Sequence, residues 1–205
     1  TDSSNGFHDA LGNVMVDQPD PGYGGSAEGG SGNNTIDLSN VATFSATGGY
    51  DLTGGAGNDT LTGSAYEDWM SGGTGADTMS GGGGPDEFEL QQGDSPLVTL
   101  SNGIYSFTGG AADVITDFGA DDAIWIDMLV TSSQGPRSYG DSSYEVVQGS
   151  YAAGAFTAGA GADTLLVYDG DPTAGAVMTG VVLSNVTAMN LETFGNYITL
   201  NTQPV

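Results

Sequence analysis

The apolar residues between positions 54 and 89 recur every nine residues, and an aspartate precedes each of them by two positions. This period fits neither the 3.6 residues of a helical turn nor the alternation of a simple strand, so it predicts an internal structural repeat. A disordered Gly/Asp linker, the alternative for so polar a stretch, has no reason to keep an apolar position in phase. The four units are GGAGNDTLT (54–62), GSAYEDWMS (63–71), GGTGADTMS (72–80) and GGGGPDEFE (81–89), with aspartates Asp59, Asp68, Asp77 and Asp86 and apolar residues Leu61, Met70, Met79 and Phe88.

The repeat pattern extends upstream in a weaker form. GGSGNNTID (29–37) has Asn34 where an aspartate is expected, and it lies seven residues out of phase, so an insertion separates it from the main block. Residues 39–53 are predicted to form strand, turn and strand. Leu52 falls at the apolar position of the frame that continues at residue 54, which predicts that the repeat structure begins one coil earlier. Asn34 is not expected to be a side-chain ligand.

Turn signals divide the rest of the chain into short strands. Residues 96–110 have a hairpin pattern with Asn102-Gly103 at the bend, a pair that favours a tight two-residue turn. Residues 162–186 predict two strands joined by a DGDP turn, and 191–201 predict a final strand or short helix. Residues 1–28 hold few apolar anchors and are expected to be a flexible arm or a peptide that docks on a neighbour.

Composition then limits the partners of such a chain. It carries 26 Asp and Glu against one Lys or Arg, a formal charge of −25. This imbalance excludes an ordinary nucleic-acid binder and disfavours anionic membranes, because nothing neutralises phosphate groups. The negative side chains also repel one another in the compact state, so a bound counter-charge is expected. No apolar run approaches the roughly 20 residues of a membrane helix, so no transmembrane segment is predicted.

The residue types also limit the counter-ion. The chain has no cysteine and one histidine, which excludes disulfides and the common zinc sites. Oxygen-ligated hard cations remain, calcium before magnesium. His8 is interpreted as a solvated residue of the arm, and Arg137 as an acid-pairing or loop residue.

The four units resemble the nonapeptide G-G-x-G-x-D-x-U-x of the RTX (hemolysin-type) calcium-binding proteins. The resemblance implies a parallel β-roll in which six residues form a turn and three a strand, and turns eighteen residues apart stack with calcium between them. It pairs Asp59 with Asp77 and Asp68 with Asp86, which gives at least two Ca2+ ions. It also implies backbone carbonyl ligands from the earlier turns, Gly55 and Gly57 or Ser64 and Tyr66, and from the later turns, Gly72 and Thr74 or Gly81 and Gly83.

The chemistry of calcium is consistent with this arrangement. Calcium takes six to eight oxygens at about 2.3–2.6 Å, so two carboxylates alone cannot complete a site and carbonyls must turn inward. Glycine permits the backbone conformations that this requires. One apolar residue per unit gives a narrow core, which is not expected to offset the backbone entropy of about 1–2 kcal/mol per ordered residue. Bound metal must therefore supply the difference. The unit 63–71 lacks the GGxG pattern, so a weaker or differently ligated site is expected there.

ADVITDFGADDAIWIDM (112–128) resembles the D-x-I-x-D-F segment that often follows RTX blocks. Asp113 keeps the nine-residue phase, so Asp113 and Asp117 are candidates for a further calcium ion. The alternative, left open, is a buried amphipathic strand with incidental acids and with Val114, Ile115 and Phe118 turned inward.

Other acidic pairs are interpreted as turns. Asp121 and Asp122 are predicted to be solvated. Asp169 and Asp171 lie in the DGDP sequence, which lacks the further acids of an EF-hand loop. The two strands of 162–186 resemble the terminal hairpin of many substrates of type I exporters.

Together with the RTX resemblance, these patterns imply an all-β fold, a short parallel β-roll flanked by antiparallel strands with a β-sandwich-like C-terminal cap. The expected regions are an arm (1–28), the calcium-binding roll (29–95) and a β-rich capping and secretion region (96–205). The chain starts at Thr1, so we expect a processed piece of a larger product.

The predicted function is that of a secreted, extracellular calcium-binding module with a structural role, as a surface-layer, adhesin or fibre subunit. Its expected partners are calcium, a type I exporter, and further copies or the cell surface. The alternative is the non-catalytic C-terminal module of a secreted hydrolase. The sequence holds no HExxH or GxSxG signature, so no catalytic residue is predicted.

Overall fold

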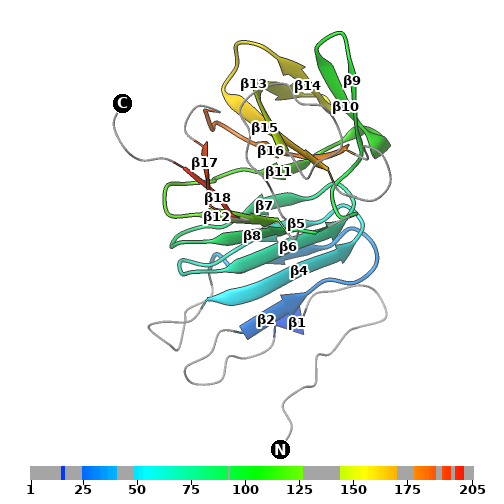
Figure 1. The fold of residues 1–205 in the computed structure, drawn as a ribbon. Coiled ribbons are helices and arrows are strands. Elements are labelled where there is room, and N and C mark those ends of the chain that lie inside the picture. The colour runs from blue at the N-terminus through cyan, green and yellow to red at the C-terminus, as the bar shows by residue number, and fades with distance from the viewer. Residues whose placement is uncertain are drawn as a thin grey trace, which may run out of the picture.

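The computed structural model describes residues 15–16, 25–40, 49–91, 93–126, 144–169, 178–187, 191–194 and 197–200 (Figure 1). These residues form an all-β fold of two sheets, together with one short 3-10 turn, η1 (Thr108–Gly110). The eight-stranded sheet has the order β1 (Met15–Val16), β2 (Gly25–Glu28), β4 (Tyr50–Ala56), β6 (Trp69–Thr74), β8 (Glu87–Leu90), β12 (Ala123–Ile126), β18 (Tyr197–Leu200) and β17 (Leu191–Phe194). The ten-stranded sheet has the order β3 (Thr35–Asp37), β5 (Thr60–Thr62), β7 (Thr78–Ser80), β11 (Asp113–Ile115), β16 (Met178–Leu183), β15 (Asp163–Asp169), β13 (Tyr144–Ala152), β14 (Ala155–Ala158), β10 (Ile104–Phe107) and β9 (Val98–Ser101).

The repeat block forms a parallel β-roll. From β4 to β8 the chain alternates between the two sheets, and strands two apart in sequence pair in parallel. The register sets Leu61 opposite Met79 and Met70 opposite Phe88, eighteen residues apart, as the RTX resemblance implies. Leu52 lies opposite Met70, which confirms that the roll begins one coil before the main block. Figure 1 shows these strands stacked in two layers.

The upstream unit adds a further coil in spite of its insertion. β3 pairs in parallel with β5, with Ile36 opposite Leu61. β2 pairs with β4, with Ala27 opposite Leu52. Residues 25–28 therefore belong to the roll, and the prediction of a flexible arm was wrong for them, because Ala27 fills an apolar position that the sparse sequence pattern did not reveal. The first strand predicted within 39–53 falls largely on residues 41–48, outside the described part of the chain.

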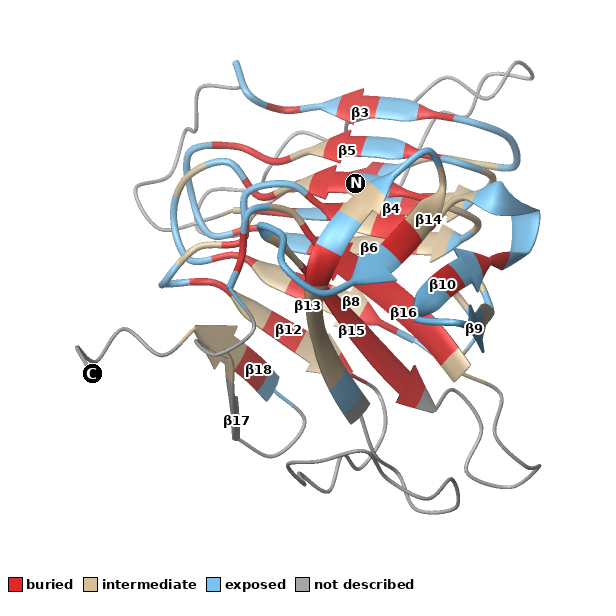
Figure 2. Cartoon of the chain, turned by 90° about the horizontal axis from the view of Figure 1, so that it is seen from above, coloured by how far each residue is buried: buried red, intermediate tan, exposed pale blue. Residues whose placement is uncertain are grey.

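The core lies between the two sheets and runs on into the C-terminal half. In each roll strand the apolar residue points inward and its neighbours point outward, so buried and exposed positions alternate (Figure 2). One cluster of buried side chains includes Leu61 and Phe88 of the roll together with Ile115, Leu183 and Ile198. The roll and the following strands therefore share one apolar core.

The downstream strands extend both sheets. β11 pairs in parallel with β7, and β12 with β8, so the roll gains one more coil after the inserted hairpin. The strands beyond β11 and β12 differ in direction. β16 is parallel to β11, whereas β15 is antiparallel to β16 and β18 is antiparallel to β12.

The hairpin at 96–110 is confirmed as β9 and β10. Asn102 and Gly103 have φ angles of 53° and 78°, and two left-handed residues define the tight turn that their sequence favours. This end of the ten-stranded sheet covers the outer face of β15 and β16, where a second apolar cluster includes Tyr105, Phe156 and Val182. β15 and β16 are thus buried on both faces, which makes this part sandwich-like.

The two strands predicted within 162–186 are β15 and β16, and most of the DGDP turn lies outside the described residues. The segment 191–201 differs from the prediction of one strand or a short helix, since β17 and β18 form an antiparallel pair there. Ile198 is buried against the common core, which explains why the segment is extended. Within the described residues, no helix has the length and apolar character needed to cross a membrane.

Replacing Leu61 with alanine tests the common core. Leu61 is fully buried, and we expect the calcium-loaded protein to lose about 2–5 kcal/mol of unfolding free energy. The neighbouring Thr60 is exposed, so Thr60→Ala should change it by no more than about 0.5 kcal/mol. Urea unfolding in saturating calcium measures both. Equal losses for the two variants would contradict the inward placement of Leu61.

Candidate metal centre

The turns of the roll stack along two edges. We define the first edge by the turns that precede β3, β5 and β7 and by the start of β11. The second edge consists of the start of β4 and the turns that precede β6, β8 and β12. Apart from the first position of each edge, which is Asn34 or Tyr50, each position is the aspartate of its repeat, so the structure aligns one carboxylate per coil along each edge from there on.

On the first edge, each carboxylate accepts a backbone hydrogen bond from the preceding coil. The N–H of Asn34 donates to Oδ1 of Asp59 (2.7 Å), and the N–H of Asp59 donates to Oδ1 of Asp77 (2.7 Å). The N–H of Asp77 in turn donates to Oδ1 of Asp113 (2.8 Å). The turns that supply Asp59 and Asp77 therefore stack directly, as the resemblance implied.

The second edge repeats the same ladder. Oδ1 of Asp68 accepts from the N–H of Tyr50 (2.7 Å), and Oδ1 of Asp86 accepts from the N–H of Asp68 (2.9 Å). The N–H of Asp86 donates to Oδ1 of Asp122 (3.0 Å). Backbone bonds run in the opposite sense, for example from Glu87 N–H to the carbonyl of Asp68 (2.9 Å). The two sets of bonds fix the spacing of the coils.

The ladder leaves two carboxylate oxygens without partners. Oδ2 of Asp59 and Oδ2 of Asp77 are buried and accept no hydrogen bond from the protein. The Asp77 side chain is 0% exposed. A buried ionised carboxylate is costly unless it is paired with a cation or fully hydrogen-bonded. These two oxygens therefore fit a bound cation.

Glycine at the first position of the repeat keeps the space beside the carboxylate open. A Cβ added to Gly72 would overlap Oδ2 of Asp77, and one added to Gly54 would lie 2.6 Å from Oδ2 of Asp59. The turn also needs a left-handed residue at its second position, where Gly73 has a φ of 84° and lies against the carbonyl of Gly55. Glycine thus creates the space and the close stacking of turns.

Burial controls the protonation of these groups. It raises the pKa of Asp77 to about 6 and that of Asp86 and Asp113 to about 7, while the amide bonds of the ladder act in the opposite direction. The pKa of Asp59 is also raised by burial. The metal-free fold therefore holds protons where a cation would hold the ionised form.

The degenerate unit 63–71 closes its turn differently. Ser64 donates to Asp68 through both its N–H (2.5 Å, to Oδ2) and its hydroxyl (3.1 Å, to Oδ1). The N–H of Tyr66 donates to the Ser64 hydroxyl (3.2 Å). Both oxygens of Asp68 thus have protein partners, which offsets part of the need for a cation at this turn.

The predicted carbonyl ligands lie in the stacked turns. The carbonyl of Gly72 lies against Gly54, and that of Gly81 against Gly63, in the preceding coil of each edge. Among the predicted carbonyls, that of Thr74 accepts a backbone bond from Gly57 N–H (2.8 Å) and that of Ser64 accepts one from Gly83 N–H (3.0 Å). A carbonyl has two lone pairs, so these bonds leave each of the two oxygens one pair for an ion.

Asp113 and Asp117 are separated by the structure. Asp113 is buried at the first edge and continues the ladder above Asp77. Asp117 is exposed and accepts from Ser80 Oγ (2.6 Å) and from the N–H groups of Gly81 (2.9 Å) and Gly82 (3.0 Å), at the start of a second-edge turn. Asp113 is the first residue of β11 and Asp117 lies two residues beyond its end, so the two carboxylates stand at different edges of the roll. Ile115 and Phe118 face the common core, whereas Val114 packs against the second cluster.

Asp122 was predicted to be a solvated turn residue, and the structure contradicts this. It is buried, it accepts from Asp86, and its Oδ2 accepts from the N–H of Gly119 (2.7 Å). The signal was available in the sequence: Asp122 follows Asp113 by nine residues, and Ile124 holds the apolar position two residues later. Ile124 lies opposite Phe88, in the register of the repeat.

A buried polar network joins the first edge to the C-terminal strands. Ser95 Oγ lies 2.7 Å from the hydroxyl of Tyr168, and the Ser95 side chain is hydrogen-bonded to Asp113. Burial raises the pKa of Tyr168, which keeps its hydroxyl neutral. The last carboxylate of the ladder is therefore fixed by a residue of the inserted segment and by β15.

In the described part of the chain, no three His, Asp or Glu side chains converge on one point as a ready-made metal site. The carboxylates come in stacked pairs instead. A calcium ion here would take most of its oxygens from backbone carbonyls, in line with the sequence prediction.

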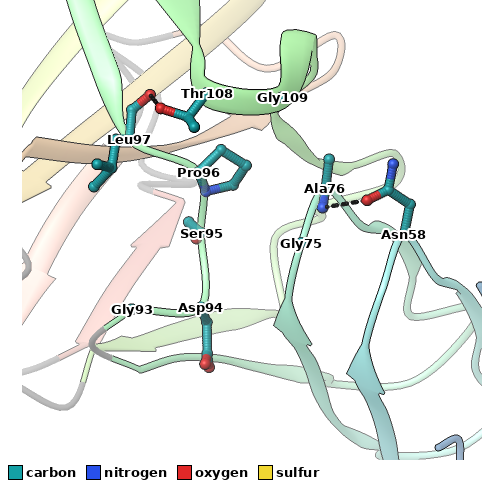
Figure 3. A pocket seen from close by; sticks show the side chains of 10 residues that line it. All are labelled: Asn58, Gly75, Ala76, Gly93, Asp94, Ser95, Pro96, Leu97, Thr108 and Gly109. Carbon is teal, nitrogen blue, oxygen red and sulfur yellow. Dashed lines mark hydrogen bonds between the residues drawn. The ribbon is translucent and has the colours of Figure 1, made fainter. Parts of the chain in front are cut away.

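A cavity of about 310 Å3 lies beside the turn at Gly75 (Figure 3). Asn58 and Ala76 form one wall, where Asn58 Oδ1 accepts from Ala76 N–H (3.1 Å), and Asp94, Ser95 and Pro96 form the opposite wall. Asp94 is the one titratable group in its lining. A single carboxyl group provides no acid–base pair or nucleophile, so this cavity does not define an active site.

Residues 53–88 match the family model of the RTX calcium-binding nonapeptide repeat, in 4 copies. The match shows that the chain contains an RTX, hemolysin-type repeat block, and it coincides with the β-roll. RTX repeats bind calcium and occur in secreted proteins, so this stretch is a calcium-binding, secreted-type module that is not itself catalytic. A comparison of the whole chain with curated proteins gives no match.

Replacing Asp77 with asparagine tests the effect of the carboxylate's charge while the shape of the side chain stays nearly the same. Asparagine keeps an oxygen for the Asp59 N–H but removes the buried negative charge. We expect the calcium concentration needed for folding to rise at least about tenfold, because ligand charge sets calcium affinity. In excess chelator at neutral pH, the variant should retain more structure than the wild type, since no charge is buried.

Glu28→Gln is the matched control for Asp77→Asn. Glu28 lies exposed on β2 and its replacement also removes one negative charge from the roll. Circular dichroism during calcium titration follows both variants. An equal shift for the two would show that only net charge matters.

The raised pKa values predict an acid-stabilised metal-free fold. In the folded chain the pKa values of Asp77, Asp86 and Asp113 are about 6 to 7, against 3.8 for the unperturbed side chain. At pH values between these limits the folded chain therefore binds more protons than the unfolded chain. Their stabilising contribution is complete below the unfolded pKa and is lost as the pH rises through about 6–7. In excess chelator, β-structure should therefore increase when the pH is lowered from about 7.5 to about 4.5. A loss of β-structure over that range would contradict the buried placement of these carboxyls.

Proposed function

We propose that this chain is a secreted structural module that folds when extracellular calcium enters the two edges of its roll. Asp59 and Asp77 hold one ion on the first edge, and Asp68 and Asp86 hold a second on the other edge. The carbonyl ligands are those of Gly55, Gly57, Gly72 and Thr74 for the first ion and of Ser64, Tyr66, Gly81 and Gly83 for the second.

One observation carries the proposal: Oδ2 of Asp59 and Oδ2 of Asp77 are buried in adjacent coils without a hydrogen-bond partner. Arg137 is the chain's single Lys or Arg, and one cationic side chain cannot neutralise the carboxylates of two edges. A divalent cation supplies both the charge and the missing coordination. We extend the proposed row of ion-binding carboxylates by one coil at each edge, to Asp113 on the first and Asp122 on the second. Each of these carboxylates accepts the backbone N–H of the aspartate in the preceding coil.

The charge of −25 suits export before folding. In a calcium-poor cytosol the carboxylates repel one another and the chain stays unfolded, the form that a type I exporter passes. Outside the cell, calcium exceeds the dissociation constants of about 10⁻⁴–10⁻³ M that are typical of extracellular modules. Binding to the folded state alone then stabilises it by mass action.

We further propose that residues 29–95 act as the calcium-binding roll and 96–205 as the capping and secretion region. The module serves as a surface-layer, adhesin or fibre subunit. In support, the described residues stack carboxylates along both edges of the roll, and the outer strands of the two sheets, as far as they are described, offer edges to a neighbour.

Small-angle X-ray scattering against calcium concentration tests the export and folding cycle. For 205 residues we expect a radius of gyration of about 49 Å in chelator and about 17 Å once folded. The change should fall between about 0.1 and 1 mM calcium, and magnesium at the same concentration should not produce it. A compact chain at about 0.1 µM calcium would contradict folding after export, because that level represents the cytosol.

A further inference from the structure

The free edge of the ten-stranded sheet differs from the rest of this acidic chain. β9 is its last strand and, among the described residues, pairs along its length with β10 only; on its other side the one bridge is that of Leu97, the residue before β9, with Thr179 of β16. The unpaired amide and carbonyl groups of such a strand are a template for another strand. β9 contains no proline and no lysine, the residues that commonly protect an edge.

Large apolar side chains surround this edge. Leu97, Leu100 and Ile104 are 44%, 54% and 43% exposed. Leu100 is paired with Tyr105 and Ile104 with Ser101, so the two exposed residues lie on opposite faces of the hairpin and flank the edge. Exposed apolar residues grouped at one edge indicate an interaction site.

Charge identifies the partner. No charged residue occurs from Ser95 to Ala112 or from Val146 to Ala162, although the whole chain carries −25. These two segments contain β9, β10 and β14, which are adjacent at this end of the sheet. A second copy of so acidic a chain is repelled by surfaces rich in carboxylates and can approach an uncharged one.

The other sheet edges lack this property. β3 contains Asp37, β17 contains Glu192, and the two residues of β1 are followed directly by Asp17. A contact between β9 and one of these edges would bring a neutral strand to an acidic one, whereas β9 against β9 joins two neutral edges. Identical antiparallel strands are related by a twofold axis, so the resulting contact closes as a dimer and does not continue as a filament.

We infer that two copies of the folded chain dimerise through β9, with Leu97, Leu100 and Ile104 packed across the twofold axis. The inference rests on the proposed structural role, and it names the partner as a second copy and the surface as the β9 edge. Because the contact is small, its dissociation constant should lie in the micromolar range, about 1–100 µM.

Sedimentation velocity of the calcium-loaded chain tests this over about 1–300 µM protein, a range that brackets the expected dissociation constant. We expect the wild type to shift from its monomer mass of 20.5 kDa to twice that mass. Leu100→Asp should remain monomeric, because it places a charge on each side of the contact. Added KCl should leave the wild-type dimer unchanged or tighten it, since no ion pairs cross a neutral edge.

Trp69→Asp is the matched control, because Trp69 is 47% exposed on β6 in the opposite sheet. This variant should dimerise like the wild type. Leu100→Thr keeps a strand-forming residue while removing apolar area, and it should weaken the dimer about tenfold even if Leu100→Asp fails to fold.

Circular dichroism separates this inference from the proposed function. The β9 contact is supported if every variant folds at the calcium concentration that folds the wild type, while only the wild type and Trp69→Asp form dimers. A wild type that folds with calcium and stays monomeric at every concentration overturns the contact and leaves calcium-driven folding intact. Dimers of Leu100→Asp or Leu100→Thr with wild-type affinity overturn it as well, as does the loss of dimers in Trp69→Asp.

Discussion

The structure depends on carboxylates that are placed inside it to accept backbone amides. Along each edge of the roll, the aspartate of one coil accepts the N–H of the coil before, so the acids hold the turns in register. The same placement buries negative charge, and Oδ2 of Asp59 and Asp77 has no partner in the protein. A chain with one Lys or Arg and one His cannot neutralise its carboxylates from within. Folding of the roll and binding of a cation are therefore coupled.

This requirement explains the order of the remaining elements. Each strand of the roll contributes one apolar residue to the core. The stacked turns at both edges must be held together before the parallel strands can present an apolar surface to the C-terminal half. β11 and β12 add to that surface in parallel, and the antiparallel strands follow. Ser95 and Tyr168 secure the last first-edge carboxylate, Asp113, against β15. A calcium ion at the first edge, as proposed, would thus support strands that lie far from the repeat block in sequence.

The sequence predicted the parts of the fold in which a local period fixes the geometry. The RTX resemblance implied that Asp59 and Asp77 stack, and the nine-residue phase identified Leu52 as the start of an earlier coil and singled out Asp113. This phase also reaches Asp122, nine residues after Asp113, but the neighbouring Asp121 suggested a solvated turn, so Asp122 was not identified as part of the ladder. The pairing of β17 with β18 and the folding of β9 and β10 over β16 depend on contacts between distant segments, which no local pattern encodes.

Hydrogen exchange of the ladder amides, followed by NMR, tests the central claim most directly. The backbone N–H groups of Asn34, Asp59 and Asp77 donate to carboxylates of the next coil and are therefore reporters of the closed edge. Protection of these three amides in saturating calcium, with rapid exchange in excess chelator at neutral pH, is the predicted result. Equal protection in chelator would show that the coils stack without a cation and would contradict the dependence of this fold on metal.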